Sequence, residues 1–172
     1  ASADYLMSTI ERAETAGAEA VLIELDTPGG LVSATQDVIQ AMLNASVPTI
    51  VFVTPRGAGA ISAGTFITLA ANVAVMQPGT TIGAAHPVSL FGGESPPAQE
   101  PPAGGESEAT RSGRSVVDQK TENYLAAYVE SIAKQRKRNV EWAEQAVRHS
   151  VAVSAEEALE LGVIDLIAKD RS

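Results

Sequence analysis

A serine in a bend of small residues is the first candidate for chemistry in this chain. Ser62 follows Gly57, Ala58, Gly59 and Ala60, and it stands between a run of β-formers and an apolar helical pattern. Small side chains let a substrate approach a hydroxyl closely, and the free N–H groups of a helix that starts there face any developing negative charge. The pattern predicts a nucleophile for acyl transfer, although a serine before an apolar run also serves as an ordinary helix N-cap.

A serine hydroxyl is a weak nucleophile, so it needs a base nearby. Lys120 precedes an apolar helical stripe, where partial burial would favour the neutral amine that a base requires. His86 follows a third apolar run, and His149 lies near the end of a helical pattern. Imidazole is the commoner general base, so spacing alone leaves all three candidates open.

A second loop of small residues could lie beside the serine. Residues 26–30, which end in Gly29 and Gly30, directly follow another apolar run. In a parallel sheet the carboxyl ends of neighbouring strands meet at one edge, so this loop is expected next to the Ser62 turn. The backbone amides of Gly30 and Ala63 are then the candidate oxyanion hole.

The elements that must position these residues alternate along the chain, which predicts an α/β fold. Strands are expected at 20–25, 48–53 and 73–76, and helices at 3–16, 31–45, 63–71, 116–138 and 139–149. The first strand is apolar enough to predict burial on both faces. Near the C-terminus, Ser154 and Glu157 form a capping box before a short helix that ends at Gly162 and leads into a strand.

Composition narrows the possible functions. The 172 residues, 45% of them hydrophobic, suit a single domain spanning residues 1–172, and no run is long enough for a membrane helix, so this piece is expected to be soluble. A net charge of -9 argues against a nucleic-acid partner. The one basic run, 134–138, is expected to be a solvated helix face. Cysteine is absent, which excludes a thiol nucleophile, and neither a metal nor a cofactor is expected.

The helical and strand patterns stop between residues 87 and 115. This stretch is rich in Pro, Gly, Ser and Glu. It has too few large apolar groups to offset the entropy of ordering, so a mobile surface loop is expected. Loops of this length inside a compact domain are more often used to gate substrate or bind a partner than to serve only as connections.

Four motifs, taken in chain order, resemble the Clp protease and crotonase-like superfamily. They are Asp26-Thr-Pro-Gly-Gly30, Ser62-Ala-Gly-Thr-Phe66, the segment 77–86 and the segment 154–165. More narrowly, they resemble the N-terminal protease domain of the NfeD family of membrane-bound serine proteases, the partner proteases of stomatin operons. The resemblance covers nearly the whole chain apart from the Pro/Gly-rich loop. It implies a spiral of β-β-α units, with a layered sheet and flanking helices.

The same resemblance implies a serine endopeptidase with a Ser-Lys dyad. The family's serine falls on Ser62 and its lysine on Lys120, and its oxyanion-hole positions fall on Gly30 and Ala63. The implied substrates are hydrophobic segments of membrane-associated proteins such as stomatin homologues. The resemblance also implies a homo-oligomer such as a dimer, and a full-length protein that is associated with the membrane through segments outside this chain, with this domain on the extracytoplasmic side.

Two departures from the family pattern bear on the base. His86 falls where Clp peptidases keep their catalytic histidine, which makes it the alternative base, but Ser150 stands where the orienting aspartate would align. We therefore favour Lys120, which needs no such partner. The loop before Lys120 is longer than the family pattern, so it could hold Lys120 away from Ser62 until a substrate or partner orders it.

Other functions stay open at this point. They are a Ser-His Clp-like peptidase, a crotonase-like acyl-CoA enzyme that needs no serine nucleophile, and a non-catalytic scaffold that binds a membrane partner through the loop. Labelling of Ser62 by a serine-reactive phosphonate would argue against the acyl-CoA enzyme. Binding that survives Ser62→Ala would support the scaffold.

Overall fold

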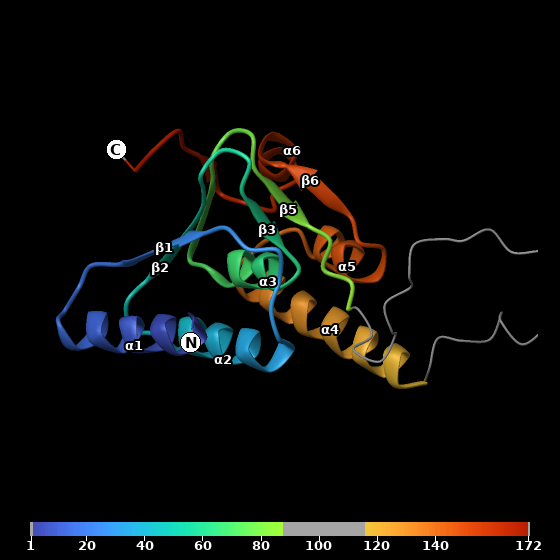
Figure 1. Ribbon diagram of the computed structural model, residues 1–172, viewed down its shortest axis with the longest axis horizontal. Helices are drawn as coiled ribbons and strands as arrows, with labels where there is room; N and C mark the ends of the chain where they lie inside the picture. The colour runs from blue at the N-terminus through green and yellow to red at the C-terminus, as the bar shows by residue number, and fades with distance from the viewer. Residues whose placement is uncertain (1, 88–115, 172) are drawn as a thin grey trace, which may run out of the picture.

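Two small sheets with helices around them form the fold, which we describe from a computed structural model for residues 2–87 and 116–171 (Figure 1). The first sheet is parallel throughout, in the order β1 (Val21–Leu25), β2 (Thr49–Val53), β4 (Val73–Met76) and β7 (Leu166–Ile167). The second sheet has the order β3 (Gly59–Ile61), β5 (Thr81–Gly83) and β6 (Ala152–Ser154). Strands β3 and β5 are parallel, whereas β6 is antiparallel to β5.

The helices lie close to the bounds that the sequence predicts. They are α1 (Ser2–Thr15), α2 (Val32–Asn44), α3 (Ala63–Ala70), α4 (Val116–Gln135), α5 (Val140–Arg148) and α6 (Ala155–Glu160). Figure 1 shows α1 and α2 side by side along the lower edge, with α3 near the centre of the molecule. The predicted capping box is confirmed, because Ser154 accepts from the Glu157 amide and the Glu157 side chain accepts from the Ser154 amide.

The chain passes back and forth between the two sheets. Strand β2 in the first sheet is followed by β3 in the second and then by α3, and β4, β5 and α4 repeat this order. This is the predicted spiral of β-β-α units, and the predicted α/β class is confirmed. The sequence did not predict β3, β5 or β6, because three residues are too few to show a period.

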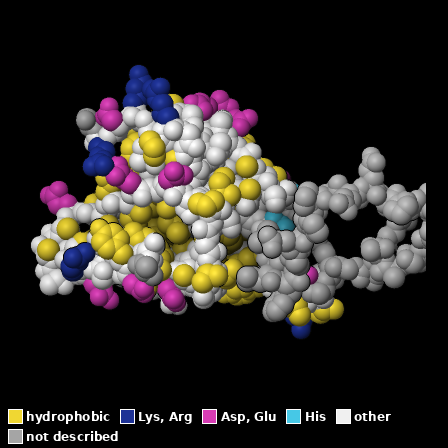
Figure 2. Space-filling view, in the orientation of Figure 1, with side chains coloured by type: hydrophobic (Ala, Val, Ile, Leu, Met, Phe, Trp, Pro, Cys, Tyr) yellow, Lys and Arg dark blue, Asp and Glu magenta, His cyan; other side chains and the backbone are white. Residues whose placement is uncertain are grey.

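The prediction that the first strand is buried on both faces is wrong. Side chains of β1 alternate between buried and exposed, and Leu22 is 47% exposed. In the described part of the chain β1 pairs only with β2 and is an edge strand of its sheet. Figure 2 shows hydrophobic side chains gathered in a hollow around β1 and β2, above helix α1. One face of β1 thus packs on the core while the other faces outward.

Helix α3 is the central element of the core, since all of its residues are buried. Its last carbonyls are capped by arginine side chains. Arg138 donates to the carbonyls of Leu69 and Ala71 at 3.1 and 2.8 Å, and Arg136 donates to Ala70 at 2.8 Å. Arg138 is only 6% exposed and pairs with Asp165 at 2.9 Å, so the prediction of a solvated basic face at 134–138 is wrong at this residue.

The sequence also led to expectations about a loop, membrane helices and metal-binding groups. The loop predicted at 87–115 falls, except for Pro87, outside the described residues. Within residues 2–87 and 116–171, no helix is both long enough and apolar enough to cross a membrane. The same ranges hold no group of three or more His, Cys, Asp or Glu side chains that could bind a metal ion.

Candidate active site

Ser62 stands in a strained turn between a strand and a helix. It links β3 to α3 with φ 52° and ψ −111°, a backbone conformation that costs free energy for any residue with a Cβ. Its side chain makes no capping hydrogen bond, so the alternative of an ordinary N-cap is not what the structure contains. A serine on a sharp, strained strand-to-helix turn is the geometry of a nucleophile elbow, which presents the hydroxyl clear of the backbone.

Hydrogen bonds on both sides hold this turn. The Ser62 amide donates to the Gly83 carbonyl at 3.1 Å, and the Ser62 carbonyl accepts from the Thr65 amide at 3.0 Å. Gly83 has φ +131°, and a Cβ at this position would lie 2.2 Å from the Val151 carbonyl oxygen. Only glycine therefore allows β5 to pass closely enough to β6 while its carbonyl meets Ser62.

The small-residue loop at 26–30 is bound to β3, directly beside the serine. The Thr27 amide donates to the Gly59 carbonyl at 2.8 Å, and the Ile61 amide donates back to Thr27 at 3.1 Å. The Asp26 carboxylate accepts from the Gly59 amide at 3.0 Å. The prediction that the two loops meet at one sheet edge is confirmed.

Two glycines of this loop lie against Ser62 and the residue after it. A Cβ on Gly29 would be 3.2 Å from the Ser62 Cβ and 3.5 Å from its hydroxyl, and a Cβ on Gly30 would be 3.6 Å from the Ala63 Cβ. Among the described residues, none accepts a hydrogen bond from the amide of Gly30 or of Ala63. Two unengaged N–H donors therefore lie within a short distance of the serine, as an oxyanion hole requires.

His86 lies between the first half of α4 and the C-terminal end of α5. Its Nδ1 lies 2.9 Å from the Val147 carbonyl of α5 and 4.0 Å from Glu122 of α4. A carbonyl can only accept, so Nδ1 carries the proton and Nε2 of the neutral ring is left with a lone pair. The side chain is 27% exposed, so water and substrate can reach it. His86 follows Gly83 by three residues, and the Gly83 carbonyl accepts a hydrogen bond from the Ser62 amide.

Glu122 is a site candidate that the sequence reasoning missed. It is 9% exposed, and Arg148 lies 3.6 Å away with further bonds to Glu144 at 2.6 Å and Asn123 at 3.0 Å. The hydrogen bond that Arg148 donates to Glu144, together with the negative charges of Glu144 and Glu122, raises the pKa of Arg148. The sequence does hold a signal for Glu122, since this carboxylate stands on the apolar stripe of α4, one turn before Leu125. A charge on a buried helix face needs a partner, which marks the position as a site candidate.

Lys120 lies on a ridge of α4 that faces the other helices of the site. Tyr124 and Tyr128 follow at four-residue spacing, with ring centroids 6.1 Å apart. Tyr124 accepts a 2.5 Å hydrogen bond from Gln36 of α2. The Lys120 side chain itself is exposed, and no described residue forms a hydrogen bond or ion pair with it, so the predicted partial burial is not found.

Two contacts fix how α3 and α4 lie along each other. The rings of Phe66 and Tyr128 stack with centroids 6.3 Å apart, and Arg136, the residue after the end of α4, donates to the carbonyl of Ala70 at the end of α3. The helices therefore run in the same direction. One turn back from Phe66 is Ser62, and the matching step of four residues on α4 leads from Tyr128 to Tyr124, with Lys120 one further turn, about 6 Å, toward the start of the helix. The turn of α4 that holds Tyr124 therefore lies level with the serine.

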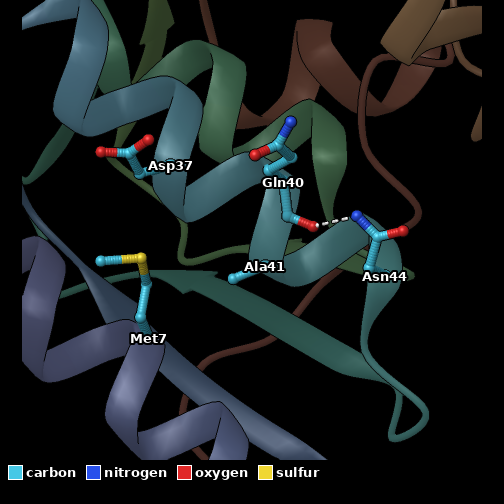
Figure 3. Close-up of a pocket in the computed structure, with 5 residues that line it drawn as sticks. All are labelled: Met7, Asp37, Gln40, Ala41 and Asn44. Carbon is cyan, nitrogen blue, oxygen red and sulfur yellow. Dashed lines mark hydrogen bonds between the residues drawn. The ribbon is translucent and has the colours of Figure 1, made fainter.

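Two other features lie outside this cluster. His149 is exposed at the C-terminal end of α5, where its amide donates to Gln145. A hollow of about 330 Å³ lies between α1 and α2 (Figure 3) and is lined by Met7, Asp37, Gln40, Ala41 and Asn44. None of the residues predicted for catalysis lines it. The structure therefore brings together Ser62, Ala63 and Gly30, and it places His86 and the Lys120 helix on the flanks.

Comparison with known families shows which family this chain belongs to. The family model for the N-terminal domain of NfeD1b matches residues 2–170. The chain belongs to the NfeD1b N-terminal domain family. This membership confirms the resemblance to the NfeD family that the four motifs indicate.

Two curated relatives of this NfeD1b-type domain are longer proteins. Over 158 residues it is 37% identical to the membrane-bound protease PH1510 of Pyrococcus horikoshii, which covers 92% of this chain and 32% of that protein. Over 83 residues it is 34% identical to the membrane protein NfeD1b of Bacillus subtilis, which covers 48% of this chain and 18% of that protein. The chain thus spans about a third or less of the curated relatives that it matches.

Solved structures with the same fold belong to the 1510-N membrane-bound stomatin-specific protease. A lysine-to-alanine variant in complex with a substrate peptide superposes with a TM-score of 0.79 at 36% identity, covering 98% of this chain and 69% of the other. A serine-to-alanine variant gives a TM-score of 0.82 at 35% identity, covering 99% of this chain and 74% of the other. The Clp-like fold predicted for this NfeD1b-type domain is confirmed by these structures.

Proposed function

We propose that this chain is the catalytic domain of a serine endopeptidase in which Ser62 is the nucleophile. The observation that carries the proposal is the strained turn at Ser62, with the unengaged amides of Gly30 and Ala63 beside it. A strained serine persists only where its surroundings hold it, and such positions cluster at functional sites. The relatives with this fold are named as a protease, which supports the same assignment.

The reaction follows from these groups. The Ser62 hydroxyl attacks a peptide carbonyl while a base takes its proton, and the oxygen of the tetrahedral intermediate accepts hydrogen bonds from the Gly30 and Ala63 amides. The amine leaves with the proton from the protonated base, and an acyl-enzyme remains. A water molecule, deprotonated by the same base, then releases the acid and restores the serine.

Lys120 is the base that we favour. It lies one turn before Tyr124 on α4, and the stomatin-specific protease has been studied as both a serine variant and a lysine variant. A lysine accepts a proton only as the neutral amine, and removal of water from the amine favours that form. A bound peptide lying between Ser62 and α4 would remove that water. The dyad is therefore completed by the substrate.

His86 is a second candidate with its own observation. The Val147 carbonyl fixes its tautomer, and Glu122 lies 4.0 Å from the same nitrogen. This carboxylate supplies from α4 the acid that position 150 lacks, and an acid near Nδ1 stabilises the imidazolium that forms when Nε2 takes a proton. In a Ser-His mechanism, Ser62, His86 and Glu122 would form the triad.

The substrate that we propose is a hydrophobic segment of a membrane-associated protein such as a stomatin homologue. Leu31 and Val32, directly after Gly30, are 66% and 43% exposed, and Val116, Val117 and Tyr124 on the first turns of α4 are 54–68% exposed. Apolar side chains are thus exposed at the starts of both α2 and α4. The related protease is specific for a stomatin homologue by its name.

The setting of the full-length protein follows the same relatives. They are named as membrane proteins, so we propose that this domain is attached to a membrane through parts of the protein beyond this chain, on its extracytoplasmic side. We also propose that the domain acts as a homodimer, as the family resemblance implies. Sedimentation of the purified chain should then show a dimer. No nucleic-acid partner is proposed, because the net charge is -9.

Labelling and cleavage test the nucleophile together. A serine-reactive fluorophosphonate should label Ser62, and a hydrophobic peptide should be cleaved. Ser62→Ala should abolish both and lower cleavage by at least about 10³-fold. Ser131→Ala, on an exposed position of α4, is the control and should leave both unchanged. An unlabelled wild-type chain would instead favour an acyl-CoA enzyme or a binding scaffold.

Substitutions at Lys120, His86 and Glu122 separate the two candidate bases. Lys120→Ala should abolish cleavage, and Lys120→Arg should do the same because a guanidinium does not release its proton near neutral pH. Lys134→Ala, an exposed lysine further along α4, is the matched control. If Lys120→Ala keeps full activity while His86→Ala and Glu122→Gln lose it, the base is His86.

A further inference from the structure

Thr65 carries a hydroxyl that has no contact with solvent. Its side chain is 0% exposed, one turn into α3. The Oγ1 atom lies 2.9 Å from the Ala60 carbonyl and 2.9 Å from the Gly83 carbonyl. A hydroxyl has one proton, so Thr65 shares it between two acceptors that belong to different strands of the second sheet.

Both acceptors lie next to Ser62. Ala60 is in β3, two residues before the serine, and Gly83 ends β5. The Gly83 carbonyl also accepts from the Ser62 amide at 3.1 Å, and the Thr65 amide donates to the Ser62 carbonyl at 3.0 Å. Thr65 is therefore bonded to three carbonyls around the serine. They are that of Ala60 in the strand before it, that of Gly83, which accepts from the Ser62 amide, and that of Ser62 itself.

These bonds act on the strained part of the site. Ser62 has a positive φ that relaxes unless its neighbours fix it on both sides. The bonds from Thr65 fix β3 and β5 relative to α3 at the serine, and they lie in the core, where water cannot replace them. A helix threonine usually satisfies its hydroxyl within its own helix, as Thr68 does by donating to Gly64 at 2.8 Å. Thr65 instead bonds across to two strands.

We propose that Thr65 is a positioning residue, and that its buried hydroxyl holds Ser62 in the geometry needed to attack. This rests on the proposed function of Ser62 as a nucleophile. Thr65 touches no substrate, so its loss should change the chemical step and not the binding of peptide. The expected change is in kcat and in the rate at which Ser62 reacts with a phosphonate, with KM unchanged.

Two substitutions at Thr65 and one at Thr68 test the proposal on the chain itself. Thr65→Val removes the hydroxyl at nearly constant shape and should lower kcat and the fluorophosphonate labelling rate by about 10- to 100-fold, with KM within about twofold. Thr65→Ser keeps the hydroxyl and should restore both rates to within about threefold of the wild type. Thr68→Val removes an equally buried hydroxyl from the same helix and should leave both rates within about twofold.

Amide hydrogen exchange gives a readout that does not depend on activity. The Ser62 amide should exchange at least about tenfold faster in Thr65→Val than in Thr68→Val, because its acceptor at Gly83 is no longer held. If Thr65→Val does not fold, Thr65→Ala serves for the same measurements. Equal exchange of the Ser62 amide and equal labelling in the Thr65 and Thr68 variants would overturn the proposal. Failure of the wild type to label would count against the nucleophile, and the exchange result would still decide the role of Thr65.

Discussion

Ser62 and Lys120 lie on two parts of the molecule that differ in burial and in the contacts that fix them. The serine turn is bonded to β5, to α3 and through β3 to the loop at 26–30, and the helix behind it is buried along its whole length. Lys120 is exposed on the first turns of α4, and it bonds to no residue in the described ranges. Its helix is tied to the serine side there by Tyr124 and Tyr128.

The difference suggests how the site works. A strained serine turn needs a rigid frame, and folding supplies that frame before any substrate arrives. A lysine base needs to be uncharged, and removal of water from the amine favours that form. We therefore propose that Ser62 is ready in the free domain, while Lys120 becomes an effective base when a peptide covers it. Substitutions on the serine side should therefore change stability, and substitutions on the lysine side should change activity with little effect on stability.

The largest effect is expected from Gly83→Ala on the serine side. The new Cβ would lie 2.2 Å from the Val151 carbonyl oxygen and 2.6 Å from the Ala152 Cα, at φ +131°. Strain and overpacking together should lower the free energy of unfolding by about 3–5 kcal/mol, measured by denaturant titration. The serine turn should be lost with it, since the Gly83 carbonyl holds the Ser62 amide.

Gly79→Ala is the matched control for this change. Gly79 has φ +84° but nothing within 4 Å of an added Cβ, so only the backbone strain of about 1–2 kcal/mol should appear. Equal losses in the two variants would mean that the close approach of β5 and β6 is not what holds the serine side.

Placing a glycine at Ser62 should relieve backbone strain, whereas Gly83→Ala adds it. Ser62→Gly removes the Cβ that makes φ 52° costly, whereas Ser62→Ala keeps it. The glycine variant should therefore be more stable than the alanine variant by about 1 kcal/mol, after allowing for the greater flexibility of glycine in the unfolded chain. Both variants lose the proposed nucleophile. Thermal unfolding of the two variants side by side gives the difference, and an alanine variant as stable as the glycine variant would show that the turn stores no strain.

The same contrast explains what the sequence could predict. The parts of the site set by short-range rules were predictable: small residues at the Ser62 bend, two glycines after β1, and a helix that starts at once. Parallel pairing of β1 and β2 then brought Gly30 to Ala63, because both loops leave the same sheet edge. The short strands β3 and β5, which hold the turn in place, gave no periodic signal.

Contacts between distant segments were not predictable from local pattern. Glu122 lies beside His86 only because α4 packs against α5 near the end of β5. Arg138 is buried because α4 ends at the last carbonyls of α3, so a run that looks like a solvated face contains a capping charge. The position of Lys120 likewise depends on packing between helices and not on its own neighbours in sequence.

The Tyr124–Gln36 hydrogen bond joins α4, which carries Lys120, to α2. Breaking it should lower stability and peptide cleavage less than the changes above. Tyr124→Phe removes the hydroxyl that accepts from Gln36 and keeps the stack on Tyr128. The free energy of unfolding should fall by less than about 1 kcal/mol, because the pair is exposed. Peptide cleavage should fall by about threefold to tenfold, since the lysine turn is less well placed.

A double-mutant cycle decides whether this contact is responsible. Gln36→Ala should produce the same loss of cleavage, and the double variant should lose no more than either single variant. Additive losses would show that Tyr124 acts through its contact with substrate instead of through α2.

The smallest effect is expected in alkaline solution, from the tyrosine that links α3 to α4. Burial, and secondly the neighbouring Tyr124, raises the pKa of Tyr128 above its usual value near 10. Below pH about 10 both folded and unfolded chains keep the proton, so this group leaves stability unchanged. Above that pH the unfolded chain releases its proton first, and the free energy of unfolding falls as pH rises through the raised folded pKa. Unfolding measured from about pH 8 to 11 should show this slope in the wild type, less of it in Tyr128→Phe and all of it in Tyr5→Phe, whose ring is 64% exposed.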